Sequence, residues 1–289
     1  PYAFELSERF NLHAAAVAWK LTGRRDLLDK AVLFLRRFAD PESGYPATDA
    51  PYLHIYAFKE EIELATPRGP KVCTGGLIHE GEFMITLSSC YDLLYDADSW
   101  TPEDRMRMEH ALRLYIGKAD WMITDGDTNN IPSGGMAGAL LCSLTLQDMH
   151  WVKRFVEGPG GVAGMMRTGI MDDGWYFEGA GNYVLLFADM FARLAQAAEP
   201  WGLNLKGLKV APSYRKDAML APWSLPREKP FLGMSFQKFG PVRHNVRSIK
   251  DVWDAMLPFT DERGILFGNN DSTDKDMAHG YDLAYYLWR

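Results

Sequence analysis

Apolar residues recur every three or four positions along most of the chain, which predicts a mainly helical protein. In the first such segment, for example, Phe10, Ala14 and Val17 would lie on one face of a helix. The same spacing predicts helices over residues 5–21, 25–39, 78–95, 102–122, 136–147, 151–157, 162–171, 181–198, 245–257 and 274–288.

The clearest helix start is Thr101-Pro102-Glu103-Asp104, where an N-capping hydroxyl precedes proline and two acids. Polar, glycine-rich breaks separate the predicted helices, and one of them covers residues 125–135. Prolines interrupt residues 200–245, so we expect irregular loops or short strands there. The result is a series of helical hairpins joined by loops.

This pattern favours one fold class over the others. No βαβ alternation is visible, which argues against a doubly wound sheet, and no exact repeat period indicates a regular solenoid. An (α/α) toroid, an incomplete or complete ring of helical hairpins, fits best and would occupy residues 1–289 as one domain. In such a ring, loops at one end of the hairpins converge on a cleft.

The charge, hydrophobicity and aromatic content of the chain exclude some classes of function and favour others. Lys and Arg number 31 against 38 Asp and Glu, a formal charge of −7, which argues against a general nucleic-acid binder. A local basic cleft for a polyanion remains compatible with that total. No apolar run approaches the roughly 18 residues of a membrane span. Aromatic residues reach 13%, an excess typical of clefts that bind ring-shaped ligands.

The three cysteines, Cys73, Cys90 and Cys142, show neither zinc-ligand spacing nor an even count for disulfides, so we expect buried thiols. Asp125, Asp127 and Asp271 carry oxygen ligands, but an Asp-x-Asp spacing is a weak metal signal. No cofactor is therefore expected within this chain. Its ends, Pro1 and Arg289, do not look like natural termini and indicate a piece of a longer protein.

Two polar loops precede predicted helices and concentrate candidate chemistry. Ordinary turn preferences account for Asp125–Asn130 about as well as function does. They account less well for Asp172–Tyr183, where Trp175 and its aromatic neighbours crowd around the glycine-flanked Glu178.

The string DDGWYFEGAGNY at residues 172–183 resembles a segment of the heparinase II/III-like polysaccharide lyases. The upstream string TNNIPSGGMAGAL resembles a second segment of that family, and FGNNDS at 267–272 resembles a third. The three occur in the family's order. The resemblance implies an α/α toroid followed by a β-sandwich domain beyond this chain, where a structural divalent metal would belong.

The resemblance also implies β-elimination at a uronic acid in a polysaccharide. That reaction requires a neutraliser for the substrate carboxylate, a base for the C5 proton and an acid for the leaving oxygen. Carried over by position, Asn129 or Asn130 would neutralise the carboxylate and Tyr183 would act as base and acid. Glu178 would orient partners or bind sugar hydroxyls.

The family often has a histidine directly after the asparagine pair, where this chain has Ile131. His244 is the best replacement because Arg243 and Arg247 lie nearby in the sequence, and His79 is a second candidate. Without such a histidine, the chain would use tyrosine alone or be a poorly active relative.

Other residues would bind the substrate. Aromatic rings would stack on sugars, and the arginines would hold carboxylates or sulfates. The expected substrate-binding residues are Trp175, Tyr176, Asn182, His79, Arg243, Arg247, Asn270 and Asp271, with Tyr52 and Tyr56 as further stacking rings.

Two alternatives stay open. Asp125, Asp127, Asp173 and Glu178 would serve an α/α-toroid glycoside hydrolase, and a non-catalytic glycan-binding relative is the other. The expected partner in each case is a polysaccharide or oligosaccharide, acidic for a lyase, and the resemblance implies a periplasmic or secreted location. The sequence specifies neither the polymer nor the oligomeric state.

Overall fold

The computed structural model describes the chain except for residues 1, 52–67, 72–76, 125–127, 212–245 and 270–271. The described chain is mainly helical, which confirms the predicted all-α class. It divides into two compact units. Unit 1 holds Pro1–Met122 and Gly134–Lys153, and unit 2 holds Ile123–Ser133 and Arg154–Arg289. The toroid and the β-sandwich domain stay predictions.

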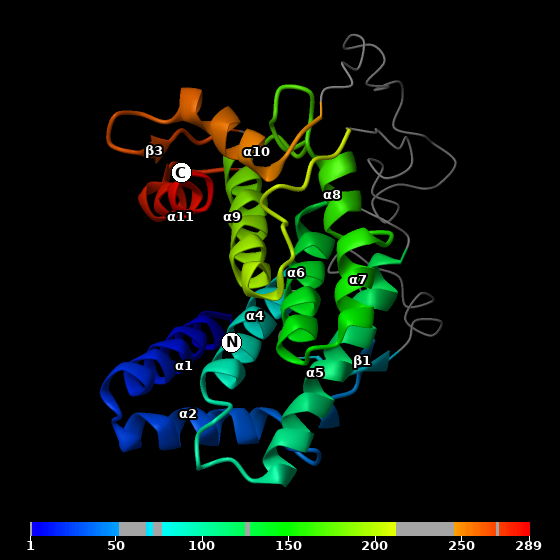
Figure 1. The fold of residues 1–289 in the computed structure, drawn as a ribbon, viewed down its shortest axis with the longest axis vertical. Helices are drawn as coiled ribbons and strands as arrows, with labels where there is room; N and C mark the ends of the chain where they lie inside the picture. The colour runs from blue at the N-terminus through cyan, green and yellow to red at the C-terminus, as the bar shows by residue number, and fades with distance from the viewer. Residues whose placement is uncertain (1, 52–67, 72–76, 125–127, 212–245, 270–271) are drawn as a thin grey trace. The chain divides into compact units, whose positions relative to one another are not determined.

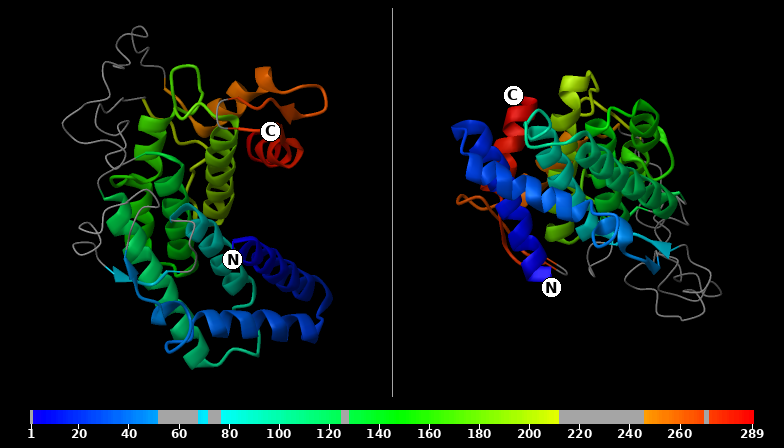
Figure 2. Two further views of the ribbon diagram at one scale, coloured as in Figure 1. Left: turned by 180° about the vertical axis from the view of Figure 1, so that it is seen from behind. Right: turned by 90° about the horizontal axis from the view of Figure 1, so that it is seen from below.

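Unit 1 is built on helices α1 (Tyr2–Thr22), α2 (Arg25–Phe38) and α4 (Leu77–Leu93), which pack against one another (Figure 2). Helix α2 shows why: its buried residues, including Leu28, Val32 and Leu35, follow the three–four spacing of one helix face.

Helix α5 (Pro102–Ile123) begins as the sequence predicts. The Thr101 hydroxyl accepts a hydrogen bond from the Asp104 N–H at 3.1 Å, and the Asp104 carboxylate accepts one from the Thr101 N–H at 3.0 Å. This reciprocal pair satisfies two backbone donors at the helix start. Asp104 also pairs with Arg36 of α2 at 2.6 Å.

Helix α6 (Asn130–Thr145) begins earlier than predicted, so the expected break over 125–135 is wrong for its second half. The helix tolerates Gly134, Gly135 and Gly138 because α4 lies very close. A Cβ atom on Gly81 of α4 would lie 2.0 Å from the Gly134 carbonyl oxygen, so a larger residue there has no room. Close packing therefore overrides the low helix propensity of glycine.

A buried ion pair crosses unit 1. Lys118 Nζ of α5 lies 2.7 Å from a carboxylate oxygen of Glu80 on α4, and these side chains are only 4% and 2% exposed. The same ammonium donates to the Pro70 carbonyl at 2.7 Å. Lys118 thus holds Pro70, directly after β2 (Arg68–Gly69), to the two helices.

Unit 2 contains α8 (Val162–Gly169), α9 (Gly181–Ala198), α10 (Ile249–Met256) and α11 (Ala278–Trp288), while α7 (Met149–Glu157) continues into it from unit 1. Helices α10 and α11 both pack on α9 (Figure 1). Along α9, Val184, Phe187 and Phe191 are buried, again at helical spacing.

The remaining regular structure is short. Strand β1 (Ala50–Pro51) pairs antiparallel with β2, Ala50 opposite Gly69, and β3 (Ile265–Leu266) pairs antiparallel with β4 (Lys275–Asp276), Ile265 opposite Asp276. Single 3₁₀ turns occur at η1 (Tyr45–Ala47), η2 (Glu199–Trp201) and η4 (Leu257–Phe259). No helix in the described ranges combines the length and hydrophobicity that a bilayer crossing requires.

Candidate functional site

The segment Asp172–Tyr183 starts as a tight hairpin in unit 2. Ile170 and Tyr176 form an antiparallel bridge, and the Met171 N–H donates to the Trp175 carbonyl at 2.8 Å. Gly174 has φ +89°, and a Cβ atom there would meet the Asp251 carbonyl oxygen at 2.7 Å. The glycine is therefore required both by the turn and by the approach of α10.

Tyr176 does not take its predicted role as a sugar-stacking ring. Its side chain is 0% exposed and stacks on Phe187 of α9, with ring centroids 4.3 Å apart. The ring also covers Gly169, where a Cβ atom would lie 2.7 Å from it. Tyr176 is a core residue, and its neighbour Trp175, which is only half-buried, remains a candidate for contact with a ligand.

Glu178 joins the hairpin to the start of α6. Its Oε2 accepts a hydrogen bond from the Asn130 N–H at 2.8 Å, and Asn129 Oδ1 accepts one from the Ile131 N–H at 2.9 Å. Two N–H donors of the first helical turn, which have no partner within the helix, are thereby satisfied, one by each side chain. The predicted neutralisers and the predicted glutamate are therefore neighbours.

The start of α9 is completed from far along the chain. Its N-cap position, Ala180, has no side chain that caps the helix. Instead Asn269 Oδ1 accepts a hydrogen bond from the Gly181 N–H at 2.8 Å, and the Ser272 hydroxyl accepts one from the Asn182 N–H at 2.9 Å. Asn269 Nδ2 also donates to the Gly179 carbonyl at 2.7 Å.

These contacts bring together the three segments that resemble the lyase family. The hairpin segment binds the asparagine segment through Glu178 and binds the FGNNDS segment through Asn269. Tyr183 lies in the first turn of α9, half-buried, five residues after Glu178. All the residues of this junction belong to unit 2.

The junction contains buried ionisable groups. Burial raises the pKa of Glu178 to about 7, although the Asn130 N–H stabilises the charged form. The pKa of Tyr176 lies well above its ordinary value because the hydroxyl is buried and close to that carboxylate. The Tyr176 hydroxyl lies near Glu178 and Ser133 without a hydrogen bond of good geometry to either.

We expect Glu178 to make stability depend on pH. Its pKa is about 7 in the folded chain against 4.5 in the unfolded chain, so the folded state binds the proton more tightly. Its favourable contribution is complete below pH 4.5 and is lost as the pH rises through about 7. The loss amounts to about 3 kcal/mol.

Urea denaturation across this pH window tests the expectation, because Glu178→Gln should remove most of the fall in stability. The exposed Glu262→Gln variant, also in unit 2, should keep the wild-type dependence. An unchanged pH profile in Glu178→Gln would contradict the assignment.

A cleft of about 710 Å³ opens beside the hairpin in unit 2. Its wall combines the hairpin, helix α10 with the turn after it, and Asn269. The lining residues are Asp173, Trp175, Gly179, Arg247, Asp251, Asp254, Ala255, Pro258, Phe259 and Asn269. Trp175 and Phe259 meet edge to face, with centroids 4.9 Å apart.

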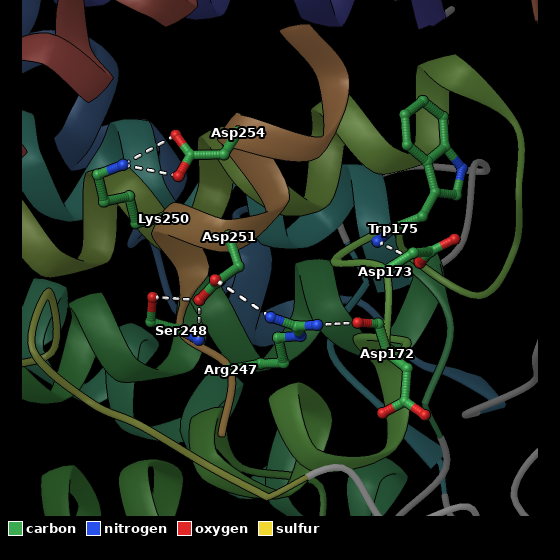
Figure 3. Close-up of polar contacts among 8 residues, drawn as sticks. All are labelled: Asp172, Asp173, Trp175, Arg247, Ser248, Lys250, Asp251 and Asp254. Atoms are coloured by element: carbon green, nitrogen blue, oxygen red, sulfur yellow. Dashed lines mark hydrogen bonds and ion pairs between the residues drawn. The ribbon is translucent and has the colours of Figure 1, made fainter. Parts of the chain in front are cut away.

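Most charges in this wall are already paired. Arg247 binds the Asp172 carbonyl oxygen through one terminal nitrogen and lies 3.6 Å from the Asp251 carboxylate through the other. Both oxygens of Asp254 accept from Lys250, at 2.8 and 2.7 Å. Figure 3 shows Lys250 with Asp254 on one side, Asp173 with Trp175 on the other, and Arg247 between Asp251 and Asp172. The Arg247 guanidinium is thus engaged within the protein and not directed to a substrate carboxylate.

Several predicted residues lie elsewhere. His79 is in unit 1, on α4, where its Nδ1 is 3.7 Å from Glu82. Asn182 is half-buried at the start of α9, and its side-chain oxygen is buried without a hydrogen bond. Outside the described residues lie Tyr52, Tyr56, Asp125, Asp127, Arg243, His244, Asn270 and Asp271.

Among the polar and aromatic residues of the cleft, four were not predicted from the sequence: Asp251, Asp254, Phe259 and Asn269. The first two lie on α10, where charges at helical spacing indicate only a solvated face. Asn269 lies within the FGNNDS string, so the resemblance of that string to the lyase family did point to this part of the site.

Cys90 and Cys142 are buried, and burial raises the pKa of each thiol to about 12. Among the residues that the structure describes, no three His, Cys, Asp or Glu side chains are grouped to hold a metal ion. No protein-family model matches the chain, and neither does any curated protein. A function for the chain therefore rests on its own residues.

Proposed function

We propose that the chain is the helical part of a polysaccharide lyase that cleaves a uronic-acid-containing polymer by β-elimination. The convergence of three segments carries the proposal. Residues that the resemblance relates only by order along the chain are joined by the Asn130–Glu178 hydrogen bond and by the contacts of Asn269 with Gly179 and Gly181. A periplasmic or secreted location belongs to the same proposal.

The asparagines would neutralise the uronate. Asn129 uses its side-chain oxygen to cap α6, and neither Asn129 Nδ2 nor Asn130 Nδ2 donates a hydrogen bond to another described residue. Amide donors next to a helix N-terminus favour negative charge. They would stabilise the dianion that forms when the C5 proton leaves.

Tyr183 would remove that proton and return it to the leaving glycosidic oxygen. The first turn of α9 fixes its backbone, because Asn269 and Ser272 cap this turn and the Tyr183 N–H bonds to the Ala180 carbonyl at 3.0 Å. Glu178 would act as a positioning residue, since it holds Asn130.

A panel of uronate polymers followed by ultraviolet absorbance tests the proposal. β-Elimination leaves a conjugated C4–C5 double bond in the product, so absorbance should rise together with new reducing ends for at least one polymer. Polymers without uronic acid provide the control, because they cannot form this product. Absence of any absorbance change across alginate-, heparin-, chondroitin- and ulvan-type polymers would refute it.

A glycoside hydrolase is the second candidate, and one observation favours it. Glu178 has the raised pKa, about 7, that suits a general acid, and Asp173 supplies an exposed carboxylate on the same segment. New reducing ends without ultraviolet absorbance would identify this activity in the same panel.

A further inference from the structure

We infer that the cleft beside Trp175 binds an uncharged sugar unit, not the uronate itself. The inference rests on the proposed function in one respect: that unit belongs to the polymer being cleaved. The cleft has a volume of about 710 Å³, within the range of roughly 300–1,000 Å³ for small-molecule sites.

An anionic sugar does not fit the charges of the wall. Three carboxylates and one guanidinium line the cleft. Both terminal nitrogens of that guanidinium, on Arg247, are occupied by Asp172 and Asp251. A uronate placed here would face three carboxylates, and the one cation of the lining, Arg247, already contacts Asp172 and Asp251. Such a placement of like charge is unfavourable in a partly desolvated site.

A cationic ligand fits little better. Lys250 already binds both oxygens of Asp254. Asp251 accepts from the Ser248 N–H and hydroxyl, each at 2.7 Å, in addition to its contact with Arg247. Only Asp173 lacks a cationic partner among the residues of this wall, and one of its oxygens accepts from the Trp175 N–H at 2.9 Å.

The wall instead offers what a neutral sugar needs. Carboxylates that are held in place retain lone pairs for hydroxyl donors, because each carboxylate oxygen accepts more than one hydrogen bond. The edge-to-face pair of Trp175 and Phe259, the latter 51% exposed, supplies apolar surface for the C–H face of a ring. The wall therefore offers acceptors for neutral hydroxyl donors and an aromatic surface for a sugar ring, a combination that suits an uncharged carbohydrate.

Isothermal titration calorimetry tests this inference with oligosaccharides of equal length. The uncharged probes are cello-, manno-, xylo- and N-acetylchito-oligosaccharides, and the charged probes are oligogalacturonate and oligomannuronate. We expect at least one uncharged probe to bind with an affinity that does not change with salt, since ion pairing is absent.

Trp175→Ala should weaken that binding about ten-fold, the effect of roughly 1.4 kcal/mol of lost ring contact. Trp201→Ala is the matched control, because Trp201 is 41% exposed in the same unit but does not line the cleft. Equal thermal unfolding of Trp175→Ala and Trp201→Ala shows that the loss of binding does not come from misfolding of the alanine variant.

The inference is overturned if no uncharged probe binds, if Trp175→Ala binds as well as Trp201→Ala does, or if only charged probes respond to Trp175→Ala. Its failure is distinguishable from that of the proposed function, because elimination is read by absorbance and binding by heat. Calorimetric binding without elimination would support the assignment of the cleft and contradict the proposed lyase activity. Elimination with no effect of Trp175→Ala on binding would support the lyase activity and contradict the assignment of the cleft.

Discussion

Tyr183→Phe is expected to lower the rate of uronate elimination about 10²- to 10⁴-fold, the usual contribution of a positioned proton-transfer group. The substitution removes one hydroxyl and keeps the ring, so the packing of α9 should persist. Substrate binding should persist too, since the asparagines and the cleft are unchanged. The loss should therefore appear in kcat and leave KM nearly unaffected.

The measurement is initial rate by ultraviolet absorbance on the most active polymer of the panel. Tyr285→Phe is a suitable control because Tyr285 is 71% exposed on α11 of the same unit. Equal thermal unfolding of the two variants would show that folding is intact. Elimination at the wild-type rate in Tyr183→Phe would rule out this tyrosine as base and acid.

The second large effect is on stability. Lys118→Met is expected to lower the free energy of unfolding by about 3–5 kcal/mol, because it leaves the Glu80 carboxylate buried without its countercharge. Glu80 is 2% exposed, so water cannot replace the lost ammonium. The Pro70 carbonyl would lose its hydrogen-bond donor as well.

Chemical denaturation of three variants tests this account. The double variant Glu80→Met with Lys118→Met should recover most of the loss, since two apolar chains of similar size replace the pair. Arg107→Met breaks an exposed i, i+4 pair with Glu103 and should cost about 0.5 kcal/mol or less. A double variant as unstable as Lys118→Met would show that lost packing, not the stranded charge, causes the effect.

The helices were predictable because their signals are local. Spacing alone located α2 and α9 almost to the residue, and Thr101 marked the start of α5. The start of α6 was predicted too late because the glycines at 134 and 135 are typical of a loop and not of a helix. Only the neighbouring α4 explains why small residues are needed there, and that contact is absent from the local pattern.

The candidate site was predictable only in part, for a related reason. The sequence separates Glu178 from Asn130 and Asn269 from Gly181, and their pairing depends on tertiary packing. The sequence also does not indicate which of the neighbouring rings, Tyr176 or Trp175, is buried in the core. The hairpin turns the first ring into the core and leaves the second beside the cleft. Likewise, the sequence does not reveal that Arg247 contacts Asp172 and Asp251 and is therefore not available to a substrate carboxylate.

The distant caps of α9 have a consequence for the order of folding. Asn269 and Ser272 stand 88 and 90 residues beyond the backbone groups that they bind, so forming this contact costs the closure entropy of a long stretch of chain. Contacts of such sequence separation form late. During synthesis, the first turn of α9 would lack these caps until Asn269 and Ser272 have left the ribosome, and hydrogen exchange in refolding chains should protect the Gly181 amide late.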